Sequence, residues 1–197
     1  MIDKTALINK NAKIHSSVKI GPYTIIGPNV EIGENTEVQS HVSITGNTII
    51  GKGNKIYPFV SINDPQDLKY NGEETSLVIG DNNKIREYVT INPGTIGGGG
   101  KTMIGNNCLF MISSHIAHNV KIGENCIIAG QVGFAGSSIL GNNVMIGGQA
   151  GISGHLKIGS NVQIGGGSGV IKNIPDNSKV MGYPAKDLKK FIRENKW

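Results

Sequence analysis

Two histidines close together in the sequence have the side chains best suited to proton transfer near neutral pH. His115 and His118 lie in the segment SSHIAHNV, and a positioned imidazole is the commonest general base in proteins. The same spacing is compatible with two ordinary surface histidines. It is not a complete metal site, because no third ligand of a suitable type lies near them in the sequence. General base catalysis is therefore the chemistry that this segment offers.

Further polar groups lie in two segments without any repeat, 63–78 and 92–103. The first, NDPQDLKYNGEETSLV, contains Gln66, Asp67 and Lys69, which can hydrogen-bond to a ligand. The second, NPGTIGGGGKTM, superficially resembles a phosphate-binding loop. That motif must lead into a helix, and no helical pattern follows here. We expect two loop insertions, either on a binding face or as solvated excursions.

The elements that must position these residues come from a repeat of six residues. A large aliphatic or aromatic residue recurs at every sixth position through 25 hexads, and the phase breaks only at the two insertions. Period six fits neither an α-helix nor a simple amphipathic strand. Three hexads make one triangular coil, so the chain should form about eight coils. We expect an all-β fold, a parallel β-helix over residues 1–174, followed by a short helical tail at 175–197.

Each hexad has two positions that should point into the coil. The large aliphatic residue takes the first position, and a small or β-branched residue takes the fifth. The second position is often glycine, which we expect to supply the turn together with asparagine. Cys108 and Cys126 occupy fifth positions, so both should be buried small hydrophobic residues. His115 and His118 occupy neither inward position and should face outward.

Composition and charge argue against several classes of protein. The net charge of +5 at pH 7 is modest, and aromatic and basic residues do not interleave as they do in proteins that bind single-stranded nucleic acid. No stretch approaches the roughly 18 consecutive apolar residues of a membrane span. The N-terminal segment MIDKTALINK lacks the apolar region of a signal peptide. We expect a cytoplasmic protein with no nucleic-acid partner and no stable membrane insertion.

Residues 1 to about 128 resemble the UDP-N-acetylglucosamine 3-O-acyltransferases of lipid A biosynthesis. The segments that carry this resemblance are QDLKYNGE at 66–73, IREYVTINPGT at 85–95, GGGKT at 98–102 and SHIAHNVKIGENCIIA at 114–129. From about Gly130 onward, QVGFAGSSILGNNV and GYPAKDLKKFIRE are more similar to the UDP-3-O-acylglucosamine N-acyltransferases. The resemblance implies a left-handed β-helix and a homotrimer with active sites between subunits.

The resemblance also implies roles for individual residues. His118 matches the catalytic base, which takes a proton from the sugar's hydroxyl or amino group as that group attacks an acyl thioester. The backbone N–H of Gly136 matches the donor of the oxyanion hole. The residues that match substrate-binding positions are Gln66, Asp67, Lys69, His115 and, from the N-acyltransferases, His155. Small residues that leave room for an acyl chain in the C-terminal coils are Gly165, Gly166 and Gly167.

The implied reaction needs no metal and no bound cofactor. An acyl carrier protein or coenzyme A thioester would donate the acyl group directly, without a covalent enzyme intermediate. The sequence departs from the O-acyltransferases at Ser137 and Ser153, where that family has histidines that line the site. This departure leaves the acceptor atom open between oxygen and nitrogen.

The C-terminal tail should form one helix from Pro184 to Lys196, because proline is favoured in the first turn. Leu188, Phe191 and Ile192 lie at helical spacing and would cover the apolar end of the last coil. The basic residues of the helix are Lys186, Lys189, Lys190, Arg193 and Lys196. They form either a solvated face or a docking surface for an acidic acyl carrier protein.

Taken together, the sequence favours a trimeric enzyme that moves a hydroxyacyl group from acyl carrier protein to the 3-position of UDP-N-acetylglucosamine. The first alternative is N-acylation of a UDP- or dTDP-amino sugar from acyl carrier protein or acetyl-CoA. The second is a β-helical binding protein without activity. The presence of His118, Asp67, Lys69 and Gly136 argues against that last alternative.

Overall fold

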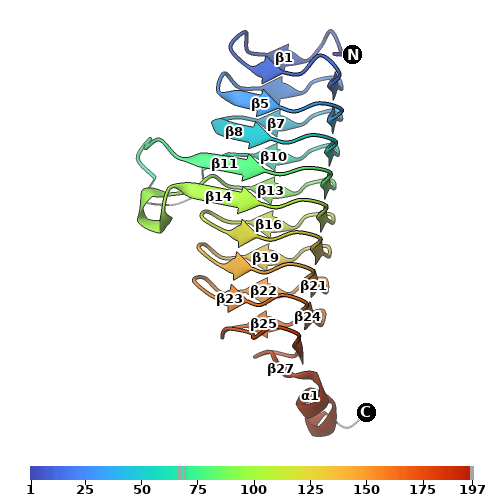
Figure 1. The fold of residues 1–197 in the computed structure, drawn as a ribbon, viewed down its shortest axis with the longest axis vertical. Coiled ribbons are helices and arrows are strands. Elements are labelled where there is room, and N and C mark those ends of the chain that lie inside the picture. The colour runs from blue at the N-terminus through green and yellow to red at the C-terminus, as the bar shows by residue number, and fades with distance from the viewer. Residues whose placement is uncertain (66–67, 69, 196–197) are drawn as a thin grey trace.

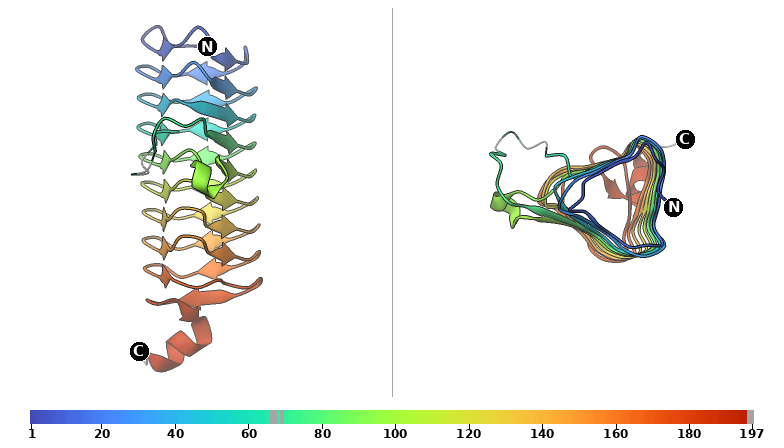
Figure 2. Two further views of the ribbon diagram at one scale, coloured as in Figure 1. Left: turned by 90° about the vertical axis from the view of Figure 1, so that its left-hand side faces the viewer. Right: turned by 90° about the horizontal axis from the view of Figure 1, so that it is seen from above.

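A three-sided prism of stacked coils forms most of the molecule in a computed structural model that describes residues 1–65, 68 and 70–195 (Figure 1). Viewed along its axis, each coil is a triangle (Figure 2). Each side of the triangle is one strand, and each side of the prism is therefore one sheet. The prism is the predicted left-handed parallel β-helix.

Strands of successive coils are neighbours in each sheet. The first sheet consists of β1 (Leu7–Ile8), β4 (Ile25–Ile26), β7 (Ser43–Ile44), β10 (Ser61–Ile62), β13 (Thr90–Ile91), β16 (His115–Ile116), β19 (Gly133–Phe134), β22 (Gly151–Ile152) and β25 (Gly169–Val170). The second consists of β2 (Lys13–Ile14), β5 (Val30–Ile32), β8 (Asn47–Ile50), β11 (Ser76–Ile79), β14 (Lys101–Ile104), β17 (Lys121–Ile122), β20 (Ile139–Leu140) and β23 (Lys157–Ile158). The third consists of β3 (Lys19–Ile20), β6 (Glu37–Val38), β9 (Lys55–Ile56), β12 (Lys84–Ile85), β15 (Leu109–Phe110), β18 (Ile127–Ile128), β21 (Met145–Ile146), β24 (Gln163–Ile164), β26 (Lys179–Met181) and β27 (Lys186–Asp187).

The pairing register follows the sequence repeat. Paired residues are 18 positions apart in regular coils, as Leu7 and Ile25 are, which is three hexads. Across the first insertion Ser61 pairs with Thr90, 29 positions on. Across the second, Ser76 pairs with Lys101, 25 positions on. The insertions therefore lengthen their coils by 11 and 7 residues without changing the register of the sheets.

The interior is filled by the two hexad positions that the sequence predicts. The first position places residues such as Ile44 and Phe110 inside, and the fifth places residues such as Val30, Cys108 and Cys126 beside them. Each coil buries these side chains against the coils above and below, and this burial is the main stabilising contribution in a solenoid. The prediction that both cysteines are buried is confirmed, since their exposed fractions are 2% and 0%.

The fourth residue of the hexad, often asparagine, and not the second-position glycine, adopts the left-handed backbone of the turns. The fourth residue of the hexad has a positive φ, 57° at Asn35 and 58° at Asn107, which asparagine tolerates better than most residues. The second-position glycines meet a different need. An added Cβ at Gly33 would lie 2.8 Å from the carbonyl carbon of Gly51 in the next coil. The prediction that these glycines supply the turn was wrong, because they permit close stacking of coils instead.

Both insertions leave the prism at one corner, where the chain passes from the first sheet to the second; we call it the loop corner. The first insertion joins β10 to β11, and the second joins β13 to β14 and contains a short 3₁₀ turn, Ile96–Gly98. Figure 2 shows them projecting from the same edge of the triangle. Farther along the axis, the same corner carries His118 after β16 and Gly136 after β19.

The C-terminal helix is shorter than the sequence predicts. Helix α1 spans Leu188–Glu194, and the carboxylate of Asp187 accepts a hydrogen bond from the Lys190 N–H at 3.1 Å. This cap starts the helix after Asp187, whereas Pro184 lies in the turn between β26 and the antiparallel β27.

The helix also does not cover the last coil. None of its residues is buried. Val180 and Ala185, which precede the helix, pack against the core instead of the helix residues.

Candidate active site at the loop corner

Side chains at the loop corner form columns, because equivalent residues of successive coils are 18 positions apart. His118 and Gly136 occupy the same place in consecutive turns, and Asn119, Ser137 and His155 occupy the next place with φ between 60° and 61°. The N–H of Ser137 donates to the His118 carbonyl at 2.9 Å, and the N–H of His155 donates to the Gly136 carbonyl at 3.0 Å. The fold therefore brings His118, Gly136 and His155 to one edge of the prism.

The imidazole of His118 lies against the backbone of Gly136. An added Cβ on Gly136 would overlap the Cε1 and Nε2 atoms of this ring, so only glycine leaves room for the ring in this position. Within the described residues, the N–H of Gly136 has no hydrogen-bond partner. A ring nitrogen and an available amide donor thus lie side by side, which is the pair of groups that acyl transfer requires.

The other ring nitrogen of His118 is held by its neighbour in the chain. The Nδ1 atom lies 2.8 Å from Oδ1 of Asn119. Asn119 is 2% exposed, and Thr95 of the second insertion hydrogen-bonds to its side chain. An amide oxygen accepts and cannot donate, so Nδ1 carries the hydrogen. In the neutral imidazole the lone pair is therefore on Nε2, the atom that faces Gly136.

His115 lies on the outer surface of the first sheet, in β16, three residues before His118 in the same coil. Its Nδ1 atom lies 2.7 Å from Oγ1 of Thr90, the residue paired with it in β13. Burial lowers the pKa of His115 below the ordinary value of 6.5, because a partly buried site disfavours the charged ring. His115 is thus a neutral hydrogen-bonding group near the candidate base.

An apolar trough runs from His115 along the first sheet toward the C-terminus. Gly133, Gly151 and Gly169 follow His115 in register, so the floor of the trough is bare of side chains. An added Cβ at Gly133 or Gly151 would meet nothing within 4 Å, whereas at Gly169 it would overlap the ring of Tyr183. The trough has a volume of about 460 Å³, and the Tyr183 ring covers its floor at the far end.

The other predicted site residues lie at another corner of the prism or outside the described residues. Gln66, Asp67 and Lys69 are outside the described residues. The segment 165–167 follows β24 and occupies the corner between the third and first sheets, across the first sheet from His118. One chain therefore does not bring these glycines to the candidate base.

The thiols of Cys108 and Cys126 lie inside the prism and away from this surface. The hydrogen bond with Cys126 and burial raise the pKa of the Cys108 thiol. Both effects disfavour a nucleophilic thiolate.

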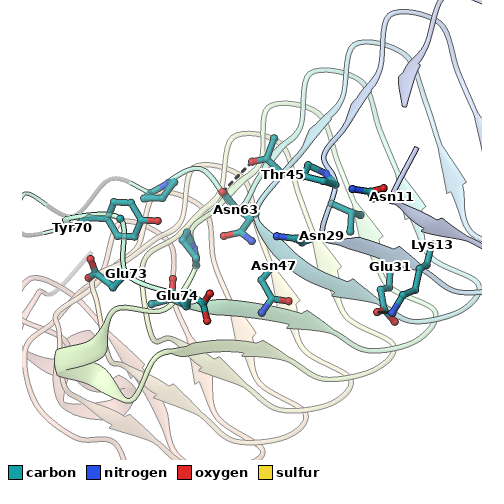
Figure 3. A pocket seen from close by; sticks show the side chains of 17 residues that line it. Asn11, Lys13, Asn29, Glu31, Thr45, Asn47, Asn63, Tyr70, Glu73 and Glu74 are labelled. Carbon is teal, nitrogen blue, oxygen red and sulfur yellow. Dashed lines mark hydrogen bonds and ion pairs between the residues drawn. The ribbon is translucent and has the colours of Figure 1, made fainter. Parts of the chain in front are cut away.

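A separate polar cavity of about 600 Å³ lies on the N-terminal side of the first insertion (Figure 3). Its lining includes Glu31, Glu73 and Glu74, with Lys13 paired to Glu31. Excess negative charge repels phosphate groups. This cavity therefore does not suit a nucleotide diphosphate, and neither His118 nor Gly136 lines it.

The sequence reasoning missed Asn119, Thr95, Thr90 and Tyr183. The sequence does offer a signal for Asn119, because this hydrogen-bonding residue directly follows the candidate base His118. The glycine floor had one too, since Gly133, Gly151 and Gly169 are 18 positions apart. No sequence spacing connects Thr95 to Asn119, because the second insertion breaks the repeat between them.

Two kinds of feature are absent from the described part of the chain. No cluster of three or more metal-binding side chains occurs among these residues. The same residues contain no helix long and apolar enough to cross a membrane, and α1 has seven residues.

Comparisons with known proteins show what the chain is similar to. The family described as bacterial transferase hexapeptide (six repeats) matches residues 2–33, 11–46 and 101–136. An acyl-[acyl-carrier-protein]–UDP-N-acetylglucosamine O-acyltransferase of Rhizobium rhizogenes is 44% identical over 84 residues, 42% of this chain and 31% of that protein. The enzyme of the same name from Psychromonas ingrahamii is 51% identical over 80 residues, which are 40% of this chain and 30% of that protein. These aligned segments span less than a third of the curated relatives.

Solved structures align over much more of the chain. The UDP-N-acetylglucosamine O-acyltransferase (LpxA) of Moraxella catarrhalis superposes with a TM-score of 0.93 and 44% identity, covering 100% of this chain and 78% of that one. LpxA of Acinetobacter baumannii superposes with a TM-score of 0.94 and 43% identity over the same shares. The similarity therefore extends past Gly130, through the coils that carry Gly136 and His155.

Proposed function

Because this chain belongs to the UDP-N-acetylglucosamine O-acyltransferase family, we propose that it transfers a hydroxyacyl group from acyl carrier protein to the 3-hydroxyl of UDP-N-acetylglucosamine in lipid A biosynthesis. The observation that carries the proposal is the position of the His118 imidazole against the backbone of Gly136. It places a proton acceptor next to an amide donor.

The proposed reaction is a direct displacement at the thioester carbonyl. The sugar oxygen attacks the carbonyl carbon while Nε2 of His118 takes the hydroxyl proton. The N–H of Gly136 donates to the negative oxygen of the tetrahedral intermediate. When the carbon–sulfur bond breaks, the imidazolium returns the proton to the departing thiolate. An ester and a free carrier thiol result, and His118 regains its starting form.

The apolar trough is the proposed site of the acyl chain. It begins beside His115 and Ala117, next to the candidate base, and its glycine floor accepts a chain without polar groups. From β16 to β25 it crosses three strand spacings, about 14 Å. An extended chain advances about 1.2 Å per bond, so roughly 12 bonds fit before the Tyr183 ring.

We further propose a homotrimer with its active sites between subunits. The glycines at 165–167 and His118 lie at different corners of one prism. A second chain placed along the first sheet can bring its own corner to the trough of its neighbour. Analytical ultracentrifugation should then give three times the chain mass of 20.8 kDa, and a monomer at working concentrations would contradict the arrangement.

The basic tail is the proposed docking surface for acyl carrier protein. Glu194 pairs with Lys186 and, at 3.9 Å, with Lys190. Lys189 and Arg193 form no salt bridge among the described residues, and both are exposed. Lys196 lies outside the description. A cytoplasmic location is proposed with this partner, because the donor and the sugar nucleotide are both water-soluble.

The experiment supplies purified protein with UDP-N-acetylglucosamine and a hydroxyacyl carrier protein. His118→Ala should lower turnover roughly 100- to 10,000-fold, the usual contribution of a general base. His15→Ala is the control, because His15 is an exposed turn residue remote from the loop corner. Normal turnover in His118→Ala would remove the ring from the mechanism.

The choice of acceptor separates the remaining candidates. A product formed only with the 3-amino analogue of the sugar nucleotide would replace the ester with an amide, the N-acyltransferase alternative. Ser137 and Ser153 at the loop corner are the observation that keeps this alternative open. Binding of the sugar nucleotide without any product would indicate the inactive binding protein.

A further inference from the structure

The second insertion is connected to the candidate base through one residue, Thr95. The Asn119 amide donates from Nδ2 to the Thr95 carbonyl at 3.0 Å. Its Oδ1 accepts from the Thr95 N–H at 3.1 Å and from the Thr95 hydroxyl at 2.7 Å. Three groups of Thr95 therefore contact both ends of the Asn119 amide, and the Thr95 hydroxyl oxygen also lies 3.5 Å from Nδ1 of His118.

These contacts allow only one orientation of the Asn119 amide. A flipped amide would place its NH₂ group against the Thr95 N–H, donor against donor, and its oxygen against the Thr95 carbonyl. Each unsatisfied buried group costs about 1–3 kcal/mol, and Asn119 is 2% exposed. The oxygen consequently stays on the side of His118.

Two other residues of the insertion hold Asn119 in place. The Asn119 N–H donates to Oγ1 of Thr102 at 2.8 Å. The backbone of Gly98 approaches so closely that an added Cβ would overlap the Asn119 side chain. Neither residue touches His118, yet both restrict the group that His118 contacts.

We propose that the second insertion is a clamp that fixes the Nδ1–H tautomer of His118, with Thr95 and Asn119 as positioning residues. The proposal rests on the function proposed above, because a fixed tautomer matters only if Nε2 acts as the base. It gives the 7 residues added at this corner a chemical purpose. A loop that only covered the corner would need no such set of polar contacts.

The direct test is the tautomer itself, read from ¹⁵N shifts of the imidazole in histidine-labelled protein, with His118→Ala to assign the signals. In the wild type, Nδ1 should be the protonated nitrogen. Asn119→Ala should weaken this preference strongly, because only the Thr95 hydroxyl, 3.5 Å away, then remains beside Nδ1. Gly98→Ala should weaken it by displacing the amide. An unchanged Nδ1–H signal in both variants would overturn the proposal.

The kinetic test isolates the Thr95 hydroxyl. Thr95→Val keeps the shape and removes the hydroxyl's hydrogen bond to Asn119, worth about 0.5–1.5 kcal/mol, together with its 3.5 Å contact with Nδ1 of His118. We therefore expect kcat to fall about 3- to 10-fold while KM stays the same. Thr95→Ser keeps the hydroxyl and should restore kcat. If Thr95→Val instead raises KM with kcat unchanged, the loop binds substrate and does not position His118.

The two readouts separate this proposal from the proposed function. The tautomer is measured without substrate. A clamp that works in a protein without acyl transfer activity would leave the inference standing and remove the function. If the protein transfers acyl groups but the tautomer of His118 does not depend on Asn119, the proposed function would stand and the clamp would be refuted.

Discussion

Replacing Gly136 by alanine should disable the site through a collision with His118. The added Cβ would overlap Cε1 and Nε2 of the imidazole, so either the ring or the turn must move. The ring is half-buried and can swing toward solvent. This movement would break its contact with Asn119 and withdraw Nε2 from the position beside the Gly136 amide.

The size of the effect follows from two consequences of the collision, a displaced His118 ring and a strained fold. A displacement of about 1 Å at a reacting group costs about 100-fold in rate, so kcat for Gly136→Ala should fall by at least that factor. Forcing an extra methyl into a filled site typically costs about 1–3 kcal/mol of stability. Both effects have one cause, the histidine ring, and this makes them testable together.

The assay combines turnover with a double-mutant cycle on the free energy of unfolding. In a His118→Ala background the obstacle is absent, so the stability cost of Gly136→Ala should largely disappear. Gly27→Ala is the matched control: its Cβ would lie 3.2 Å from Cα of Thr45, far from the site. Its cost should be the same in both backgrounds, and its kcat should be normal. An equal cost of Gly136→Ala with and without His118 would refute the reasoning.

Three further predictions concern the trough, pH and the thiols. Tyr183→Ala should move the preferred acyl donor to longer chains, measured as kcat/KM over a series of acyl carrier proteins; an unmoved optimum would leave the ring without a role in chain length. Burial lowers the pKa of His115, so the unfolded chain binds the proton first and stability falls as pH drops below about 6.5. Denaturation curves between pH 8 and 5 should show a smaller acid loss for His115→Gln than for the wild type, and parallel curves would contradict this. Cys108 and Cys126 should react with a thiol reagent only after unfolding, because both are buried; rapid labelling of the native protein would contradict their position.

The repeat makes much of the fold predictable from the sequence. Any residue a multiple of 18 positions from another lies on the same line of the prism, unless an insertion intervenes. That rule places Gly136 one coil after His118 on the same line, and it aligns Gly133, Gly151 and Gly169. It works because the core positions of every hexad must face inward, which leaves one register available.

The clamp and the tail could not be predicted in this way. Thr95 reaches Asn119 across an insertion, where the repeat says nothing about which groups meet. The preference of proline for a first turn predicts too early a start for the helix, because the cap of Asp187 and the pairing of β26 with β27 set its start. These features depend on particular hydrogen bonds between residues outside the repeat.

The same regularity explains why the proposed catalysis needs departures from it. Identical coils give every turn the same backbone, with an outward side chain but no second layer to orient it. The loop corner differs only because two insertions add chain there, and one of them lies against Asn119. Gly166 lies 30 positions, or five hexads, after Gly136, which is one coil and two further corners along the repeat. No change within one prism can therefore bring the segment 165–167 to His118. A site that uses both corners must therefore be completed by a second chain, and this requirement follows from the period of six itself.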